Sequence, residues 1–105
     1  MENIEMICFQ IISSSGAAKS SYIEAMRYAR KFDFEKAEEL IEEGKKEYLK
    51  AHEAHSELIY KETNGEKIDF SLILMHAEDQ LMAADNFRLI CEENISILKL
   101  VKDLK

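Results

Sequence analysis

The sequence contains no proline and only three glycines, Gly16, Gly44 and Gly65, in 105 residues. Proline and glycine are the strongest local interruptions of helices, so a chain with so few of them has few places to turn. Long, uninterrupted helices are therefore expected.

Long hydrophobic runs are also missing. No apolar stretch approaches the roughly 18 residues that a membrane-spanning helix needs. The N-terminal MENIEMICFQII is interrupted by Glu5 and Gln10 and lacks a basic start, so no export signal is predicted.

The two cysteines, Cys8 and Cys91, form no CxxC motif and sit among apolar residues. They are predicted to be reduced thiols of a cytoplasmic protein that pack as small hydrophobic groups, and neither a zinc knuckle nor a redox pair is indicated.

Basic residues are outnumbered, with 14 Lys and Arg against 21 Asp and Glu, for a net charge of −7. Binding to a phosphate backbone depends on clustered basic residues, so nucleic acid is not an expected partner. An acidic chain favours a basic protein partner instead. The hydrophobic content of 47% argues against disorder, and the length predicts one domain over residues 1–105.

Two short breaks divide the chain into three helices. Asn64-Gly65 is a strong turn signal, and Asp33 is placed to N-cap a helix that has Glu35 in its first turn. Helices are predicted over residues 3–31, 34–62 and 68–103, each about 30 residues or roughly 45 Å long. Such lengths suit an all-α, antiparallel up-down-up bundle.

The sequence partly matches two known motifs, a phosphate-binding loop and a zinc-protease helix, but fulfils neither. Lys19-Ser20 lacks the glycine that a phosphate-binding loop needs before its lysine, because Ala18 stands there. The run around it, SSSGAAKSS, is interpreted as a set of small residues that lets another helix approach closely. His52 and His55 are three residues apart, whereas a zinc-protease helix needs four. A metal-binding bundle that uses these two histidines and nearby acids stays open as an alternative.

The third predicted helix carries an unusually wide apolar surface. At about 100° per residue, polar residues His76, Asp79 and Gln80 share a stripe with apolar ones. Two neighbours in a small bundle do not readily cover so wide an apolar arc. We therefore expect this helix to pack inside the domain and also against copies of itself. The stripe comprises Leu72, His76, Asp79, Gln80, Ala83, Phe87, Ile90, Asn94, Ile97 and Val101.

The polar residues on this stripe limit the chemistry. A buried, unpaired carboxylate is very unfavourable, so Asp79 on a seam between subunits would need shared protons or a hard cation such as Mg²⁺. His76 lies three residues earlier, and a neutral imidazole is a good nucleophile near neutral pH. The same residues are also typical of a polar pair that only sets helix register, so from spacing alone both interpretations stand.

The sequence as a whole resembles the lactose/cellobiose (chitobiose) type of IIA component of the bacterial sugar phosphotransferase system. The resemblance covers almost the whole chain. It rests on four segments in order and spacing: ICFQIISSSGAAKSSYIEAM, FEKAEELIEEG, YLKAHEAHSELI and SLILMHAEDQLMAADN.

This resemblance implies a homotrimer of three-helix bundles that meet through the third helix. The histidine matching His76 would accept a phosphoryl group from the phosphocarrier HPr and pass it to a cysteine of the cognate IIB component. IIB in turn phosphorylates the sugar that enters through the IIC transporter. The aspartate matching Asp79 would lie on the trimer axis and hold a divalent metal, Mg²⁺ being the expected ion, in a structural role.

The sequence departs from the common family pattern HAQDHLM at two positions. Glu78 stands for the glutamine and Gln80 for the second histidine. His76 is therefore the only imidazole in the motif, and Gln80 is a candidate hydrogen-bond donor to the phosphoryl group. The rival hypothesis is an inactive helical oligomer that acts as an interaction or regulatory module.

Overall fold

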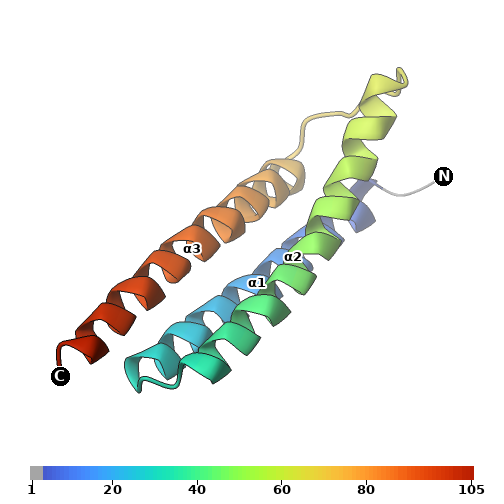
Figure 1. The fold of residues 1–105 in the computed structure, drawn as a ribbon. Helices are drawn as coiled ribbons and strands as arrows, with labels where there is room; N and C mark the ends of the chain where they lie inside the picture. The colour runs from blue at the N-terminus through green and yellow to red at the C-terminus, as the bar shows by residue number, and fades with distance from the viewer. Residues whose placement is uncertain (1–3) are drawn as a thin grey trace.

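The computed structural model describes residues 4–105 and contains three long α-helices (Figure 1). They are α1 (Ile4–Arg30), α2 (Phe34–Thr63) and α3 (Leu72–Asp103), and they run up, down and up again. The bundle is elongated, with extents of 58 × 21 × 16 Å. The all-α three-helix bundle predicted from the sequence is confirmed. The predicted first helical residue, residue 3, lies outside the described part of the chain.

The turn between α1 and α2 is tight and unusual. The Asp33 N–H donates to the Tyr28 carbonyl at 3.0 Å, and the Phe32 N–H donates to the Ala29 carbonyl at 2.9 Å. This pair of bonds is the Schellman pattern, whose left-handed residue is usually glycine. Here that residue is Phe32, with φ of 63°. Asp33 then caps α2, because its Oδ1 accepts from the Lys36 N–H at 3.2 Å, as predicted.

The connection between α2 and α3 is longer than the sequence had indicated. Gly65 adopts a φ of +88°, which confirms the Asn64-Gly65 turn. The predicted helix start at residue 68 is wrong, since residues 66–71 are not helical and α3 begins at Leu72. Ser71 sets this boundary: its backbone is extended, and its Oγ accepts from the Leu74 N–H at 3.1 Å. An N-cap serine satisfies an amide that the first helical turn leaves unpaired.

The core forms along α1, which packs closely against both other helices, whereas α2 and α3 make far less contact with each other. Small side chains allow this close packing, and Ala18, Ala25 and Ala29 are fully buried. Ser14 and Ser15, in the small-residue segment, are buried as well. The segment around Lys19 is thus continuous helix, and the interpretation of its small residues is confirmed.

Polar contacts join α2 to α3 where apolar packing is sparse. Lys45 pairs with Glu92 at 3.5 Å, and Lys99 pairs with Glu38 at 3.9 Å. These pairs are largely exposed, so each contributes little to stability. They do show that the side of α3 that carries Glu92 and Lys99 faces α2, which leaves two other faces of the helix for apolar residues.

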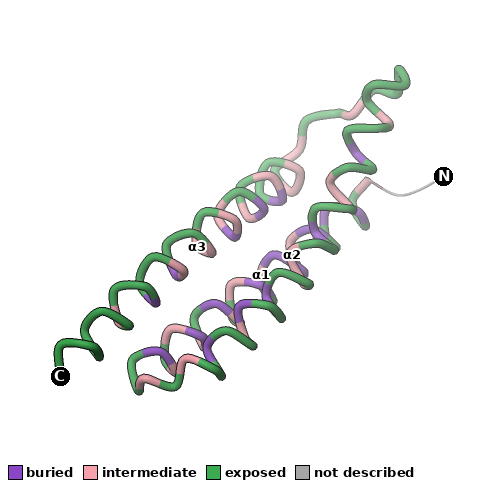
Figure 2. Tube along the Cα trace, viewed as in Figure 1, coloured by how far each residue is buried: buried purple, intermediate pink, exposed green. Residues whose placement is uncertain are grey.

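One apolar face of α3 lies in the core and the other faces outward. Ala77, Leu81, Ala84, Cys91 and Ile95 are buried against α1. The opposite side is exposed over most of the helix (Figure 2). We call it the outer face of α3, and its large apolar members are Leu72, Met75, Met82, Leu89, Ile90, Ile97 and Leu100. The predicted stripe therefore needs a correction: Phe87 packs against the core, and Met75, Met82, Leu89 and Leu100 join the exposed face.

Candidate functional site

The start of α3 places His76 in an open position. Because Ser71 caps the helix, His76 lies in the second turn of α3. His76 is exposed. Within residues 4–105, no side chain makes a hydrogen bond or ion pair with the imidazole. Both ring nitrogens are thus accessible to an incoming group, as a nucleophile requires.

A hollow of about 520 Å³ lies over this part of the outer face. Its lining residues are Leu72, Met75, His76 and Asp79, all from α3. Met75, His76 and Asp79 follow Leu72 by three, four and seven residues, the spacings that bring side chains to one side of a helix. Since every lining residue comes from α3, the described part of the chain supplies one wall of the site.

Asp79 shares the hollow with His76, as the spacing predicted. The residue is exposed in the single chain, and no ion pair joins its carboxylate to another side chain of the described residues. The charge therefore stays in water until another molecule covers the outer face. A partner that covered it would have to compensate the charge.

Gln80 lies beside this hollow and is not among its lining residues. It is half-buried, at the border between the outer face and the core. Its role as a donor to a phosphoryl group stays a prediction.

Glu78 points away from His76 and toward α2. Its Oε1 lies 2.9 Å from Nε2 of His55, which forms an interhelical pair that the sequence analysis missed. Nε2 of His55 is therefore already in contact with a carboxylate. Within residues 4–105, no group of three or more His, Cys, Asp and Glu side chains is arranged to hold a metal ion. The structure thus gives no support to the metal-binding alternative at His52 and His55.

Both thiols are buried and have no disulfide bond. Burial raises the pKa of the Cys8 thiol, and the Glu78 and Glu5 carboxylates raise it further. Burial, followed by the charge of Glu92, raises the pKa of Cys91 to about 11. Protonated, buried thiols are poor nucleophiles, so the prediction that they pack as small hydrophobic groups is supported.

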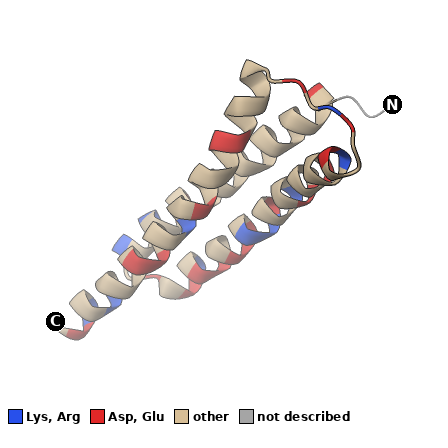
Figure 3. Cartoon of the chain, turned by 90° about the horizontal axis from the view of Figure 1, so that it is seen from above, with Lys and Arg blue, Asp and Glu red and all other residues tan. Residues whose placement is uncertain are grey.

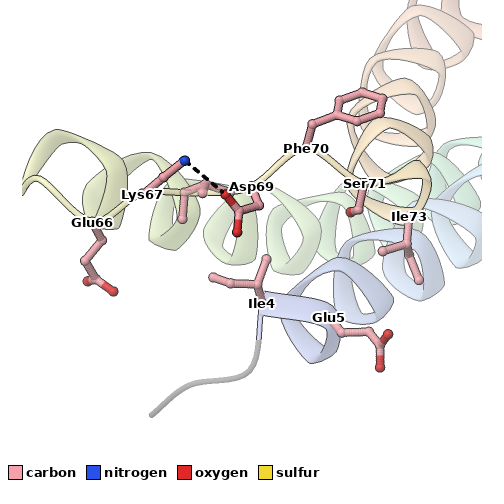
Figure 4. Close-up of a pocket in the computed structure, with 9 residues that line it drawn as sticks. Ile4, Glu5, Glu66, Lys67, Asp69, Phe70, Ser71 and Ile73 are labelled. Atoms are coloured by element: carbon pink, nitrogen blue, oxygen red, sulfur yellow. Dashed lines mark ion pairs between the residues drawn. The ribbon is translucent and has the colours of Figure 1, made fainter.

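A second hollow, of about 420 Å³, lies where the first turn of α1 meets the loop before α3 (Figure 4). Ile4 and Ile73 contribute apolar surface, while Lys67 and Asp69 form an ion pair at 3.8 Å on the loop. The Phe70 ring points away from Ile4 and is 75% exposed. No periodic pattern in the sequence marked this hollow, because the loop had been predicted as helix.

Within the described residues, no helix is long and apolar enough to cross a membrane.

Comparison with known proteins identifies the family of this chain. A model of the family described as "PTS system, Lactose/Cellobiose specific IIA subunit" matches residues 6–99. The chain is 40% identical over 81 residues to the lactose-specific EIIA component of the phosphotransferase system (PTS) of Staphylococcus aureus strain N315, covering 77% of this chain and 79% of that protein. It is 37% identical over 95 residues to the oligo-beta-mannoside-specific EIIA component of Bacillus subtilis strain 168, covering 90% and 86%.

A solved structure agrees with these sequence matches. The crystal structure of the PTS cellobiose-specific enzyme IIA from Bacillus anthracis superimposes with a TM-score of 0.94 at 35% identity, covering 98% of this chain and 94% of that one. The resemblance stated from the sequence is confirmed, and with it the general kind of activity, phosphotransfer within a sugar uptake system. The chain belongs to the lactose/cellobiose-specific IIA family of the phosphotransferase system.

Proposed function

We propose that this protein is a phosphoryl carrier whose acceptor is His76. The observation that carries the proposal is the exposed imidazole, which has no partner within residues 4–105 and lies in a hollow lined by α3. A carrier needs such a position, because donor and acceptor proteins must reach the same nitrogen in turn. The proposed donor is HPr and the proposed acceptor is a cysteine of the cognate IIB component, as the family resemblance implies.

The transfer proceeds in two balanced steps. A lone pair of the neutral His76 ring, at Nε2 by family resemblance, forms a new P–N bond as the P–N bond of phospho-HPr breaks. The HPr imidazole, protonated on its other nitrogen, leaves neutral, and His76 keeps its proton on Nδ1. The IIB thiolate then attacks phosphorus, a P–S bond forms, and His76 leaves as neutral imidazole. Positioning and stabilisation of charge on the phosphoryl oxygens account for most of the catalysis in such reactions.

The neighbours of His76 have separate parts in this proposal. Gln80 is the candidate donor to a phosphoryl oxygen, since its amide carries N–H groups at the edge of the same face. Leu72 and Met75 form the apolar wall that a docking protein covers, which keeps water from the phosphoryl group. The net charge of −7 favours a basic docking surface on the donor.

We place the working form as a homotrimer with the outer faces of the three α3 helices in contact from Asp79 onward, which leaves Leu72, Met75 and His76 open to a docking protein. A row of large apolar side chains on an otherwise polar surface supports this arrangement, with Met82 65% and Leu89 49% exposed in the single chain. Three Asp79 carboxylates would then converge on the axis.

A divalent cation, with Mg²⁺ the expected ion, fits such a set of carboxylates. Oxygen ligands from three chains match its hard-ligand preference, and one chain by itself offers no comparable group among residues 4–105. The cation would neutralise the converging charges and so hold the subunits together. Asp79 is therefore assigned a structural role, apart from the phosphoryl step at His76.

The proposed setting is the cytoplasm, where HPr and IIB exchange phosphoryl groups before the sugar entering through IIC is phosphorylated. The sugar is proposed to be a disaccharide of the cellobiose, chitobiose or lactose type. The IIA component itself contacts only proteins in this scheme.

The test is a transfer assay with enzyme I, HPr and labelled phosphoenolpyruvate. Wild type is expected to take up label, and His76→Gln to take up none. His52→Gln is the matched control, because it makes the same change at an exposed histidine on α2 and is expected to label normally. If wild type with intact helices takes up no label, the proposal fails and the inactive interaction module becomes the better account.

A further inference from the structure

The end of the bundle opposite His76 differs in charge from the rest of the molecule. The α1–α2 turn and the C-terminus of α3 lie at this end (Figure 1), and Figure 3 marks basic positions beside the C-terminus. Residues 27–36 and 99–105 hold seven of the 14 basic residues and only three of the 21 acidic ones. We call these two segments together the basic end. His76 lies about 39 Å away along α3, at 1.5 Å per residue to Lys102.

Several cations of the basic end have no carboxylate partner within residues 4–105. Glu24, Glu38 and Glu39 pair with Arg27, Lys99 and Lys36. Among the described residues, no ion pair involves the remaining four, all of which are exposed: Arg30, Lys31, Lys102 and Lys105. Their charges are therefore available to a partner.

Aromatic rings lie among these cations. The Lys31 Nζ is 5.2 Å from the centre of the Tyr28 ring, and the Lys102 Nζ is 5.9 Å from that of Phe34. Lys105 lies 5.9 Å from the centre of the Phe32 ring, which packs against Phe34 at 6.0 Å. Rings and long lysine side chains together form a surface that is apolar close to the helices and positive at its tips.

Phe32 stands out within this surface. It adopts the left-handed conformation at a position where glycine would be free of strain, and a bulky residue there is unfavourable. Its side chain is only partly buried, so core packing does not account for a phenylalanine. The ring is instead held at the tip of the bundle, among the lysines.

The geometry points to the basic end as a site that binds the anionic headgroups of a phospholipid surface, with the long axis of the bundle upright and His76 turned away from the lipid. Clustered lysines attract anionic lipids, and aromatic side chains are favoured at the interface. The contact is peripheral and needs no membrane-spanning segment.

The arrangement favours a surface over a single acidic peptide. This step rests on the proposed trimer: a threefold axis along α3 turns all three basic ends toward one plane. Each end has few unpaired cations and is weak by itself, but three coplanar ends engage an extended anionic surface at once. A short acidic peptide engages one end and gains nothing from the other two.

Sedimentation with lipid vesicles tests the inference. Wild type is expected to co-sediment with vesicles of equal parts phosphatidylcholine and phosphatidylglycerol, to be released by salt, and not to bind pure phosphatidylcholine. A triple variant, Lys31→Gln, Lys102→Gln and Lys105→Gln, is expected to lose binding by about tenfold or more. The matched control changes Lys46, Lys50 and Lys67 to glutamine, with the same loss of charge away from this end, and is expected to keep binding.

A second variant, Phe32→Gly, relieves the backbone strain at position 32 and removes the aromatic ring. It is expected to fold and to bind the mixed vesicles several-fold more weakly. Equal loss in the two lysine triples would overturn the inference, as would wild type that ignores anionic vesicles. If poly-glutamate captured the protein more tightly than the vesicles do, the partner of the basic end would be an acidic protein and the lipid proposal would be overturned. Labelling from phospho-HPr without vesicles reports on His76 separately, so failure of this inference is distinguishable from failure of the proposed function.

Discussion

The ring of Tyr22 occupies the space that a side chain at position 44 would need. A Cβ built on Gly44 would lie 2.3 Å from Cε1 of Tyr22, far inside van der Waals contact, and both residues are buried. A glycine in mid-helix is normally unfavourable. Here it lets α2 approach α1 closely enough to enclose a full tyrosine ring.

Replacing this glycine is therefore expected to destabilise the bundle. Gly44→Ala should lower the free energy of unfolding by about 2 kcal/mol, because overpacking outweighs the better helix propensity of alanine. Urea denaturation followed by circular dichroism measures the change.

Gly16 provides the control for that substitution. It is also helical, but a Cβ there meets nothing within 4 Å. Gly16→Ala should raise stability by about 0.5–1 kcal/mol through helix propensity. Equal effects of the two substitutions would contradict the packing of Tyr22 against Gly44.

Alkaline pH should weaken the fold through Cys91. Its pKa is raised to about 11 in the folded protein from the ordinary 9.0, because burial disfavours the thiolate. As pH rises past 9.0, the unfolded chain releases this proton first, and stability falls until the pH passes the folded value. The contribution lost is about 2–3 kcal/mol at most.

Unfolding curves in reductant across this pH range measure the effect. Cys91→Ala should show a shallower decline between about pH 9 and 11, whatever its stability at neutral pH. Burial raises the pKa of Tyr22 from the ordinary 10.0 to about 12, so this tyrosine accounts for a further decline between about pH 10 and 12 in both proteins. An unchanged slope in Cys91→Ala would rule out a linked thiol.

The outer face of α3 should control assembly. Met82→Glu and Leu89→Glu are expected to convert a trimer to monomers in sedimentation velocity, since each places charge among apolar side chains on the seam. Leu49→Glu is the matched control, because Leu49 is 55% exposed on α2, away from this face. A wild type that sediments as a monomer would refute the trimer, and dissociation by Leu49→Glu would move the interface to α2.

Much of the fold follows from local features of the sequence. The scarcity of turn residues predicts three long helices, and Asp33 and Gly65 mark the two breaks because caps and left-handed turns depend on single residues. His76 and Asp79 share one hollow because helical residues three apart lie on the same side. These relations need no knowledge of how the helices pack.

Other features depend on tertiary packing and were not predictable. The pair between His55 and Glu78 depends on the rotation of α2 against α3, and the contact of Tyr22 with Gly44 depends on their separation across α1 and α2. The left-handed Phe32 goes against the usual preference for glycine. The start of α3 was placed too early because the helix was predicted to begin at residue 68, soon after the Asn64-Gly65 turn, whereas the cap at Ser71 sets the boundary.

The most direct measurement is to locate the phosphoryl group on the chain. The protein would be labelled from phospho-HPr, digested at alkaline pH, where phosphohistidine survives, and mapped by mass spectrometry. The account predicts one phosphorylated peptide with the modification on His76, and unmodified His52 and His55. Phosphorylation of either of those two histidines in place of His76, or of another side chain, would contradict it.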